Sequence, residues 1–257
     1  MRSRLNYCWR LFATGFCFSV FGVGGLILWV FVFPVLRVLS RDSRRERTRY
    51  VIHKAFGVFL RLMEGVGIMK MRVDGARALE DCRHALVLAN HPTLIDVVAL
   101  ISLMPCAGCV VKRSLWKNPF LGGVVRAAGY ISNSDSDRLV DECADEIQAG
   151  RPMLVFPEGT RSNNGILSRF QRGAAYVALK SGMPIVSVLI DCDPSTLTKR
   201  EKWYQIPCRR FEYRLKVLDP VRVDRLVDAE ASRTIAARKL TRALEAHFGR
   251  ELEKWKA

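Results

Sequence analysis

Several features are missing from this sequence, and each absence removes a class of protein. The 257 residues contain no internal repeat, low-complexity tract or long linker, so we expect one domain from about residue 69 to the end. No zinc-finger spacing, RNA-recognition block or helix-turn-helix pattern accompanies the formal net charge of +16, which argues against nucleic acid as a partner. The charge instead indicates anionic lipid, or an acidic or phosphorylated carrier or substrate.

The cysteines lack the spacing of a disulfide framework or of a zinc site. Eight are scattered irregularly, and the single C-x-x-C, Cys106 to Cys109, has no second pair. This pattern is typical of reduced thiols in a cytoplasmic compartment. We therefore expect no metal.

Charge is absent from one long run. Between Arg10 and Arg37 the 26 residues LFATGFCFSVFGVGGLILWVFVFPVL carry none, and at ~1.5 Å per residue a helix of this length crosses a bilayer. The run meets Arg37 without a small-residue cleavage site, which disfavours a signal peptide. The heavier basic flank follows it, so the sequence predicts a membrane protein with its active site on the cytoplasmic side, at the inner membrane if bacterial. The glycine-rich stretch 21–25 leaves a re-entrant hairpin open beside a spanning helix.

The segment at 44–67, RRERTRYVIHKAFGVFLRLMEGVG, has apolar residues at helical spacing beside basic ones. It predicts a basic amphipathic helix on anionic headgroups, or alternatively a helix that packs on the domain. Residues 37–72 hold ten basic and three acidic side chains, so positive charge is concentrated beside the apolar run. We therefore divide the chain into an anchor at 1–67 and an α/β domain at 68–257.

The rest of the chain alternates short apolar runs with helical segments. This alternation predicts an α/β fold with a mostly parallel sheet flanked by helices. Strands are expected at 85–89, 109–112, 130–131, 153–156 and 185–190, helices at 93–104, 119–128, 135–148, 170–179 and 229–253, and an edge strand at 210–217.

A histidine and a carboxylate follow the first of these strands. In ANHPTLIDVV, His91 lies at the strand-to-helix corner and points back over the first turns, where Asp96 can reach its ring. A carboxylate on Nδ1 fixes the tautomer, leaves Nε2 free to accept a proton and stabilises the imidazolium. The pair is therefore a candidate general base for a substrate hydroxyl, although a histidine near a core is more often merely hydrogen-bonded.

A second polar group follows the strand at 153–156. Glu158, Gly159, Thr160 and Arg161 place a carboxylate, a permissive glycine, a hydroxyl and a guanidinium in four residues. The arginine fork suits phosphate or carboxylate, and Glu158 can orient it or bind substrate hydroxyls. A surface turn with a local ion pair is the alternative.

Together, NHPTLIDV and FPEGTRS resemble the H-x4-D and F-P-E-G-T-R blocks of the glycerolipid acyltransferase family, whose best-known members acylate 1-acylglycerol-3-phosphate. The resemblance runs in order from about residue 85 to residue 190. It implies direct transfer of an acyl chain from a thioester, on acyl carrier protein or coenzyme A, to the hydroxyl of a lysophospholipid, with no other cofactor.

The resemblance also implies roles for residues. His91 takes the hydroxyl proton, Asp96 orients and balances it, and Arg161 binds the anionic acceptor head in a pocket shaped by Glu158, Gly159 and Thr160. Lys112 and Arg138 are implied as further substrate contacts.

The match departs from the family pattern in one block. Members that use lysophosphatidic acid usually read G-x-[IV]-F-[IV]-D-R, whereas this chain reads GYISNSDSDR and its Arg138 comes late. Either Arg138 swings back, or the acceptor is a different lysolipid or specialised lipid. A non-enzymatic lipid-binding protein and a lipid ester or thioester hydrolase are alternatives from other classes.

Overall fold

The computed structural model describes residues 2–39, 43–134, 136–162, 166–225 and 232–256. Its centre is a seven-stranded sheet with strand order β1-β7-β6-β2-β5-β3-β4. The strands are β1 (Met69–Asp74), β2 (Leu86–Ala89), β3 (Gly108–Val111), β4 (Ile131–Ser132), β5 (Met153–Val155), β6 (Ile185–Asp193) and β7 (Phe211–Val217). All neighbours are parallel except β6 and β7, which confirms the predicted mostly parallel α/β fold.

One strand lies elsewhere than predicted. The segment at 210–217 is no edge strand, because β7 lies between β6 and β1 and pairs with both. The outer neighbour, β1, was not expected from the sequence. Its pattern MKMRVD alternates apolar and charged residues, and the apolar side chains are buried or half-buried while the charged ones are exposed, as at the edge of a sheet with one solvated face.

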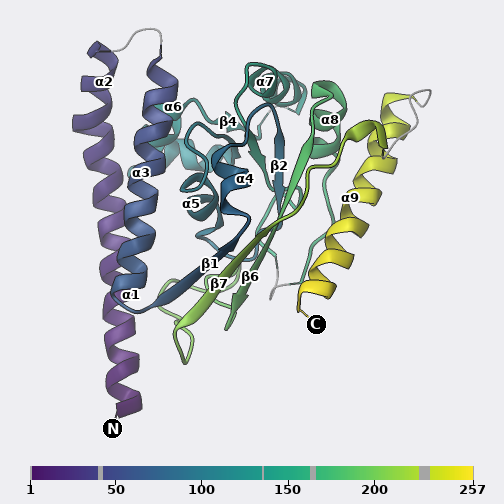
Figure 1. The fold of residues 1–257 in the computed structure, drawn as a ribbon. Helices are drawn as coiled ribbons and strands as arrows, with labels where there is room; N and C mark the ends of the chain where they lie inside the picture. The colour runs from purple at the N-terminus through teal and green to yellow at the C-terminus, as the bar shows by residue number, and fades with distance from the viewer. Residues whose placement is uncertain (1, 40–42, 135, 163–165, 226–231, 257) are drawn as a thin grey trace.

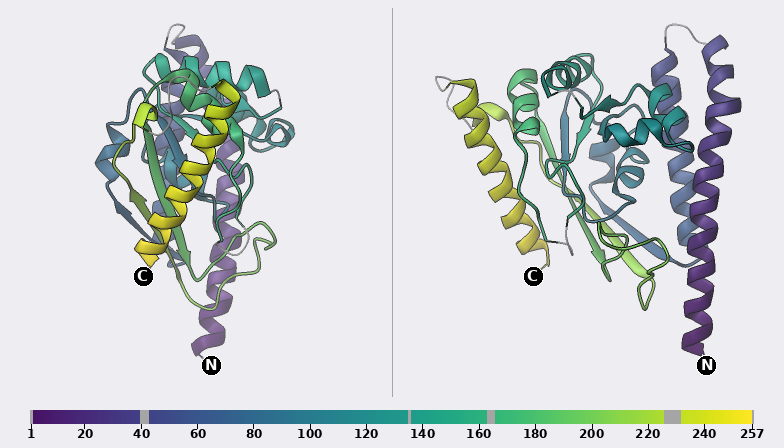
Figure 2. Two further views of the ribbon diagram at one scale, coloured as in Figure 1. Left: turned by 90° about the vertical axis from the view of Figure 1, so that its right-hand side faces the viewer. Right: turned by 180° about the vertical axis from the view of Figure 1, so that it is seen from behind.

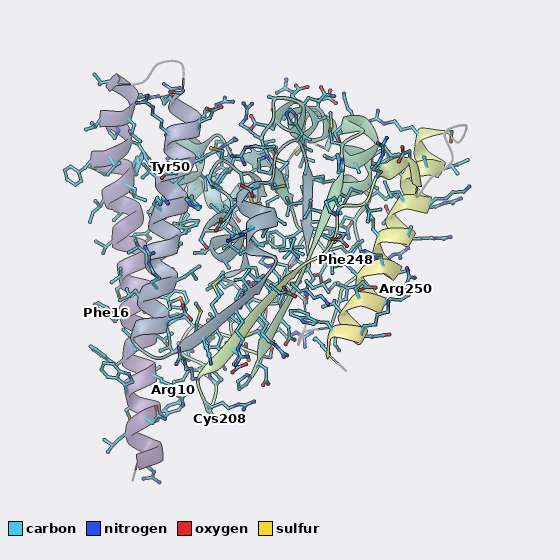
Figure 3. The ribbon with its side chains drawn as sticks, viewed as in Figure 1. Arg10, Phe16, Tyr50, Cys208, Phe248 and Arg250 are labelled. Carbon is cyan, nitrogen blue, oxygen red and sulfur yellow. The ribbon has the colours of Figure 1, made fainter. Side chains whose placement is uncertain are left out.

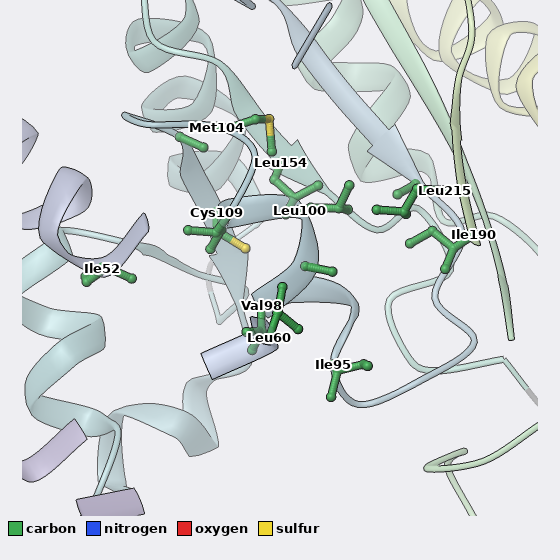
Figure 4. Close-up of a cluster of buried hydrophobic side chains, with 14 of the residues drawn as sticks. Ile52, Leu60, Ile95, Val98, Leu100, Met104, Cys109, Leu154, Ile190 and Leu215 are labelled. Carbon is green, nitrogen blue, oxygen red and sulfur yellow. The ribbon is translucent and has the colours of Figure 1, made fainter. Parts of the chain in front are cut away.

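Helices cover both faces of the sheet (Figures 1 and 2). The chain adds α3 (Arg44–Gly65), α4 (Ala76–Glu80), α5 (Asp96–Ile101), α6 (Gly122–Ala128), α7 (Ser136–Gln148), α8 (Arg172–Ser181) and α9 (Arg233–Lys256). On one face α3, α5 and α6 bury a cluster that includes Ile52, Leu100 and Leu154 (Figure 4). On the other face α7, α8 and α9 bury a second cluster around Phe170 and Phe248.

The apolar run forms one continuous helix, made of α1 (Arg2–Ile27), a wider π-helical turn at Leu28–Val32 and α2 (Phe33–Leu39). The π-helical turn ends two residues before Pro34, which has no N–H to donate to the preceding turn. The helix continues through residues 21–25, so the re-entrant hairpin is wrong. Residues 4–38 are long and apolar enough to cross a membrane by length and composition.

This helix nevertheless lies along the α/β domain. Near its start, Arg10 donates hydrogen bonds of 2.7 Å to the carbonyls of Pro207 and Cys208, and Figure 3 shows Arg10 beside Cys208. Near its end, the indole of Trp29 packs on Gly123 of α6, where a Cβ would come within 2.0 Å of the ring. The opposite face exposes large apolar side chains such as Phe16 (Figure 3).

Helix α3 packs between α1 and the domain and buries Ile52, Leu60 and Met63. The predicted alternative, a helix that packs on the domain, is therefore confirmed for the buried face of α3.

Helix α3 also carries a buried arginine, since Arg49 is 1 % exposed and binds Glu146 of α7 at 2.6 Å. Burial tends to raise the pKa of Glu146, but hydrogen bonding to Arg151 and the charge of Arg49 bring that pKa below its usual value. The buried ion pair thus joins the N-terminal helices to the far end of the domain.

Candidate active site

The site begins where β2 ends. The side chain of Asn90 exchanges two hydrogen bonds with the backbone of Ile190 on β6, at 2.8 and 2.7 Å. These bonds fix the strand end, and His91 follows directly. His91 is therefore held by the sheet itself.

His91 and Asp96 form the predicted pair. Nδ1 of His91 lies 2.7 Å from Oδ2 of Asp96, and the imidazole stacks on Phe156 with ring centroids 4.2 Å apart. Asp96 is fully buried, whereas the side chain of His91 is 16 % exposed. A carboxylate on Nδ1 leaves Nε2 as the nitrogen that can exchange a proton with a substrate.

Two further residues hold Asp96, and the sequence did not predict either. Thr93 donates its N–H at 2.8 Å to Oδ2 and its hydroxyl to Oδ1, and the phenol of Tyr213 donates to Oδ1 at 2.8 Å. Burial, and then the charge of Asp96, raise the pKa of Tyr213 well above its usual value, so the phenol stays a donor. Four donors thus surround a buried carboxylate.

These bonds also explain a shorter helix than predicted. Residues 93–95 form a turn, and α5 runs only over Asp96–Ile101. Because the Asp96 carboxylate accepts the N–H of Thr93, it caps the turn three residues before it. A signal for Tyr213 was present: the alternation of RFEYRLKV places it on the buried face of its strand, and a buried tyrosine hydroxyl usually has a partner.

Glu158 lies in a different place from the one predicted. It is 3 % exposed, and its carboxylate accepts the N–H of His91 at 2.8 Å, the hydroxyl of Ser162 at 2.8 and 2.9 Å, and the N–H of Ser168 at 2.8 Å. The carbonyl of His91 in turn accepts the N–H of Ser162 at 2.7 Å. Glu158 therefore ties its loop to the backbone of His91, and this geometry does not fit direct contact with substrate.

Arg161 is bound to the segment after β6. Its Nη1 donates to the carbonyls of Leu197 and Thr198 at 2.9 and 2.8 Å. Burial lowers the pKa of Arg161 and the charge of Asp96 opposes this effect. The guanidinium is thus a fixed cation near the His91–Asp96 pair.

A cavity of about 560 Å³ joins these groups. Its polar lining includes the expected His91, Lys112, Thr160 and Arg161, together with Gly159. Its apolar lining includes four phenylalanines from the N-terminal helices, namely Phe18 and Phe21 of α1 and Phe56 and Phe59 of α3. The cavity is therefore a largely apolar chamber with the imidazole of His91 and the cationic side chains of Lys112 and Arg161 in its wall.

Arg138 is not brought to this cavity. It is exposed on α7, and it is not among the residues that line the chamber. This position does not support the alternative that Arg138 swings back to contact the substrate.

No group of three or more histidine, cysteine, aspartate or glutamate side chains that could hold a metal occurs in the described part of the chain. All eight thiols are free. Burial raises the pKa of Cys109 to about 12, so this thiol is protonated at neutral pH.

Comparisons with known proteins agree with the fold and the motifs. A model of the family described as Acyltransferase matches residues 70–191. Human 1-acyl-sn-glycerol-3-phosphate acyltransferase beta is 25 % identical over 195 residues, 73 % of this chain and 66 % of that protein. A putative 1-acyl-sn-glycerol-3-phosphate acyltransferase, acl-2, from Caenorhabditis elegans is 32 % identical over 167 residues, 60 % of this chain and 54 % of that one. This chain therefore spans about half to two thirds of these curated relatives.

A solved structure resembles the whole chain. The crystal structure of the 1-acyl-sn-glycerophosphate (LPA) acyltransferase PlsC from Thermotoga maritima matches with a TM-score of 0.72 at 22 % identity, over 99 % of this chain and 98 % of that one. The similarity includes the N-terminal helices as well as the α/β domain.

Proposed function

Because the chain belongs to the glycerolipid acyltransferase family, we propose that it transfers an acyl chain from an acyl thioester to the hydroxyl of a lysophospholipid such as 1-acylglycerol-3-phosphate. The observation that carries this proposal is the His91–Asp96 pair, 2.7 Å apart, in the wall of an apolar cavity. An imidazole oriented by a buried carboxylate suits proton removal from an alcohol, and the cavity suits a fatty chain.

The reaction begins when Nε2 of His91 takes the proton of the acceptor hydroxyl. The resulting alkoxide attacks the thioester carbonyl, and Asp96 stabilises the imidazolium that forms. When the tetrahedral intermediate collapses, the carbon–sulfur bond breaks and the imidazolium returns its proton to the thiolate. The products are an ester and a free thiol, and His91 is neutral again.

The other residues of the cavity bind and orient the substrates. Arg161 is a fixed cation near the catalytic pair, so it binds the phosphate of the acceptor, and Lys112 adds a second positive charge. The acyl chain of the donor occupies the apolar part between α1, α3 and the sheet. Glu158 positions rather than binds, because it holds the backbone of His91.

The membrane side of the molecule is the exposed face of α1. Since Arg10 and Trp29 dock opposite ends of this helix on the domain, the helix lies in one leaflet with its apolar face in lipid, on the cytoplasmic side. An acyl chain then enters the cavity directly from the bilayer. Basic residues of the same segment contact anionic headgroups.

A second candidate keeps the chemistry but changes the acceptor. It is supported by Arg138, which occurs late in its block and does not line the cavity. The acceptor is then a lysolipid whose head does not need a second arginine.

One experiment decides between these acceptors. Purified protein in micelles is incubated with a labelled acyl thioester and a panel of lysolipids, and the product is identified by mass, with His91→Ala as the inactive control. Phosphatidate as the main product supports the first candidate. Transfer that persists in His91→Ala would exclude the proposed general base.

Arg161→Ala tests the acceptor site separately. We expect it to raise the acceptor KM at least tenfold more than the donor KM, because a charge-assisted contact to phosphate is lost. Equal effects on the two KM values would assign Arg161 to something other than the acceptor.

A further inference from the structure

A second pocket lies on the opposite side of the sheet from the catalytic cavity. It occupies about 680 Å³ between the start of α8 and the middle of α9. Four arginines line it: Arg169 and Arg172 at the start of α8, and Arg238 and Arg242 on α9. We call it the arginine pocket.

The arginine pocket carries an excess of positive charge. All four arginines are exposed, and none forms an ion pair with any residue of the described ranges. The only carboxylate in the lining, Glu245, accepts the N–H of Phe170 at 2.8 Å, and its single negative charge leaves the four arginines with a net charge of +3. Four guanidinium groups that converge on one concavity repel one another, so an anion would stabilise the arrangement.

The lining is built for a compact anion. Arg238 and Arg242 are one turn apart on α9 and present their side chains from the same face. One guanidinium group can donate two parallel hydrogen bonds to two oxygens of the same phosphate. The first turn of α8, ten residues long, opens beside them with no side chain capping its N–H groups.

The place of the arginine pocket decides the source of the anion. Helix α1, which exposes large apolar side chains, and helices α8 and α9, which hold the arginine pocket, lie on opposite sides of the sheet (Figures 1 and 2). A bilayer that holds α1 does not present its headgroups to α8 and α9. The anion therefore comes from solution.

The arginine pocket shares a wall with the catalytic site. Gln171, which lines the pocket at the start of α8, donates its N–H to the carbonyl of Pro157 at 2.7 Å. The N–H of Ser168 bonds Glu158, which holds His91. A ligand in the arginine pocket thus sits behind the loop that builds the catalytic site.

We propose that the arginine pocket binds the phosphate groups of a coenzyme A thioester. This inference rests on the proposed function, which needs a soluble thioester donor. Coenzyme A carries three phosphates at one end and its sulfur at the other end of an extended pantetheine arm. With the phosphates in the arginine pocket, the arm extends past Gln171 and Pro157 toward the catalytic cavity and delivers the thioester to His91.

The test measures binding without turnover. Isothermal titration of the full-length protein in micelles compares coenzyme A, 3′-dephospho-coenzyme A, pantetheine and inorganic phosphate. The variant Arg238→Gln/Arg242→Gln removes two charges of the arginine pocket. Arg250→Gln is the matched control, because Arg250 is exposed on the same helix outside the arginine pocket (Figure 3).

We expect coenzyme A to bind the wild type at least tenfold more tightly than its dephospho form. The double variant should bind coenzyme A about tenfold to a hundredfold more weakly and lose this preference, since it loses charge-assisted contacts. The donor KM rises by the same factor while the acceptor KM stays constant. The control variant should match the wild type.

Several results would overturn the inference. Unchanged affinity in the double variant would leave the arginines as a solvated surface, and equal competition by inorganic phosphate would reduce the pocket to a general anion site. A raised KM for acyl carrier protein alone would make it a protein-docking surface. If the double variant does not fold, Arg169→Gln/Arg172→Gln removes charge from the other wall.

The same data separate this inference from the proposed function. Phosphate-dependent binding of coenzyme A to a protein that transfers no acyl chain would refute the function and keep the site. Transfer from coenzyme A thioesters that ignores all four arginines would do the reverse.

Discussion

Replacing Asp96 by asparagine separates the charge of the proposed catalytic carboxylate from its shape. Oδ2 accepts two N–H groups, from His91 and Thr93, which cannot reverse their roles if the tautomer is kept. Oδ1 accepts two hydroxyls, from Thr93 and Tyr213, which can rotate and accept instead. The asparagine amide therefore places its NH2 at the Oδ1 position, and its carbonyl still holds the imidazole.

The loss is then mainly electrostatic. For an imidazolium and a carboxylate with charge centres about 4 Å apart and an effective dielectric constant of about 20, the attraction is about 4 kcal/mol. Without it, the proton transfer to His91 lacks that stabilisation in the transition state. At about 1.4 kcal/mol for each factor of ten, kcat falls about a thousandfold.

The assay measures kcat at saturating donor and acceptor, beside thermal unfolding of the same preparation. We expect a small change in Tm, since the two N–H groups still donate to residue 96 and the two hydroxyls accept from its amide, and little change in either KM. Asp141→Asn is the matched control, because Asp141 is an exposed carboxylate on α7. A kcat within tenfold of the wild type in folded Asp96→Asn would refute the charge-stabilised base.

Three further substitutions test contacts around the site. Tyr213→Phe removes one donor to the catalytic carboxylate, worth about 1.5 to 3 kcal/mol, so we expect kcat to fall about tenfold or more with both KM values constant; an unchanged kcat would make the phenol structural only. Glu146→Gln leaves Arg49 buried without a countercharge and should lower the free energy of unfolding by about 3 kcal/mol at pH 7. Because folding lowers the pKa of Glu146, its charge stabilises the fold at pH values above the pKa of the unfolded chain. The difference in stability between the wild type and this variant should therefore shrink as acid protonates Glu146. Gly123→Ala should cost about 1 to 3 kcal/mol in thermal unfolding through overpacking on Trp29, and a neutral result would deny that contact.

The sequence predicted the parts of the molecule that depend on local geometry. The five parallel strands of the βα units begin within one residue of the predicted positions, because each is a short apolar run between polar turns. His91 and Asp96 are five residues apart at a strand-to-helix corner, so their contact needs no information from the rest of the chain.

Other parts depend on contacts between distant segments. Tyr213 binds a carboxylate 117 positions earlier in the chain, and it does so only because β7 lies inside the sheet. The alternation of RFEYRLKV predicted an edge strand, and β1, which lies outside it, lacks the continuous apolar pattern of a buried strand. Glu158 was assigned to substrate for a similar reason: its motif indicates chemistry, while its buried donors come from residues that only the folded loop brings together.

The N-terminal helices have a role that the apolar run alone did not predict. A hydrophobic anchor needs only length and composition, but α1 and α3 also contribute Phe21 and Phe56 to the wall of the catalytic cavity, 5.8 Å apart between ring centroids. Helix α1 is apolar on two faces: one face is exposed, and the other buries Ala13 and Cys17 in the core that it shares with the α/β domain. In the proposed function, membrane contact and the substrate chamber thus share the same helix, and a fatty chain that leaves the bilayer along α1 moves from one apolar surface to another without crossing water.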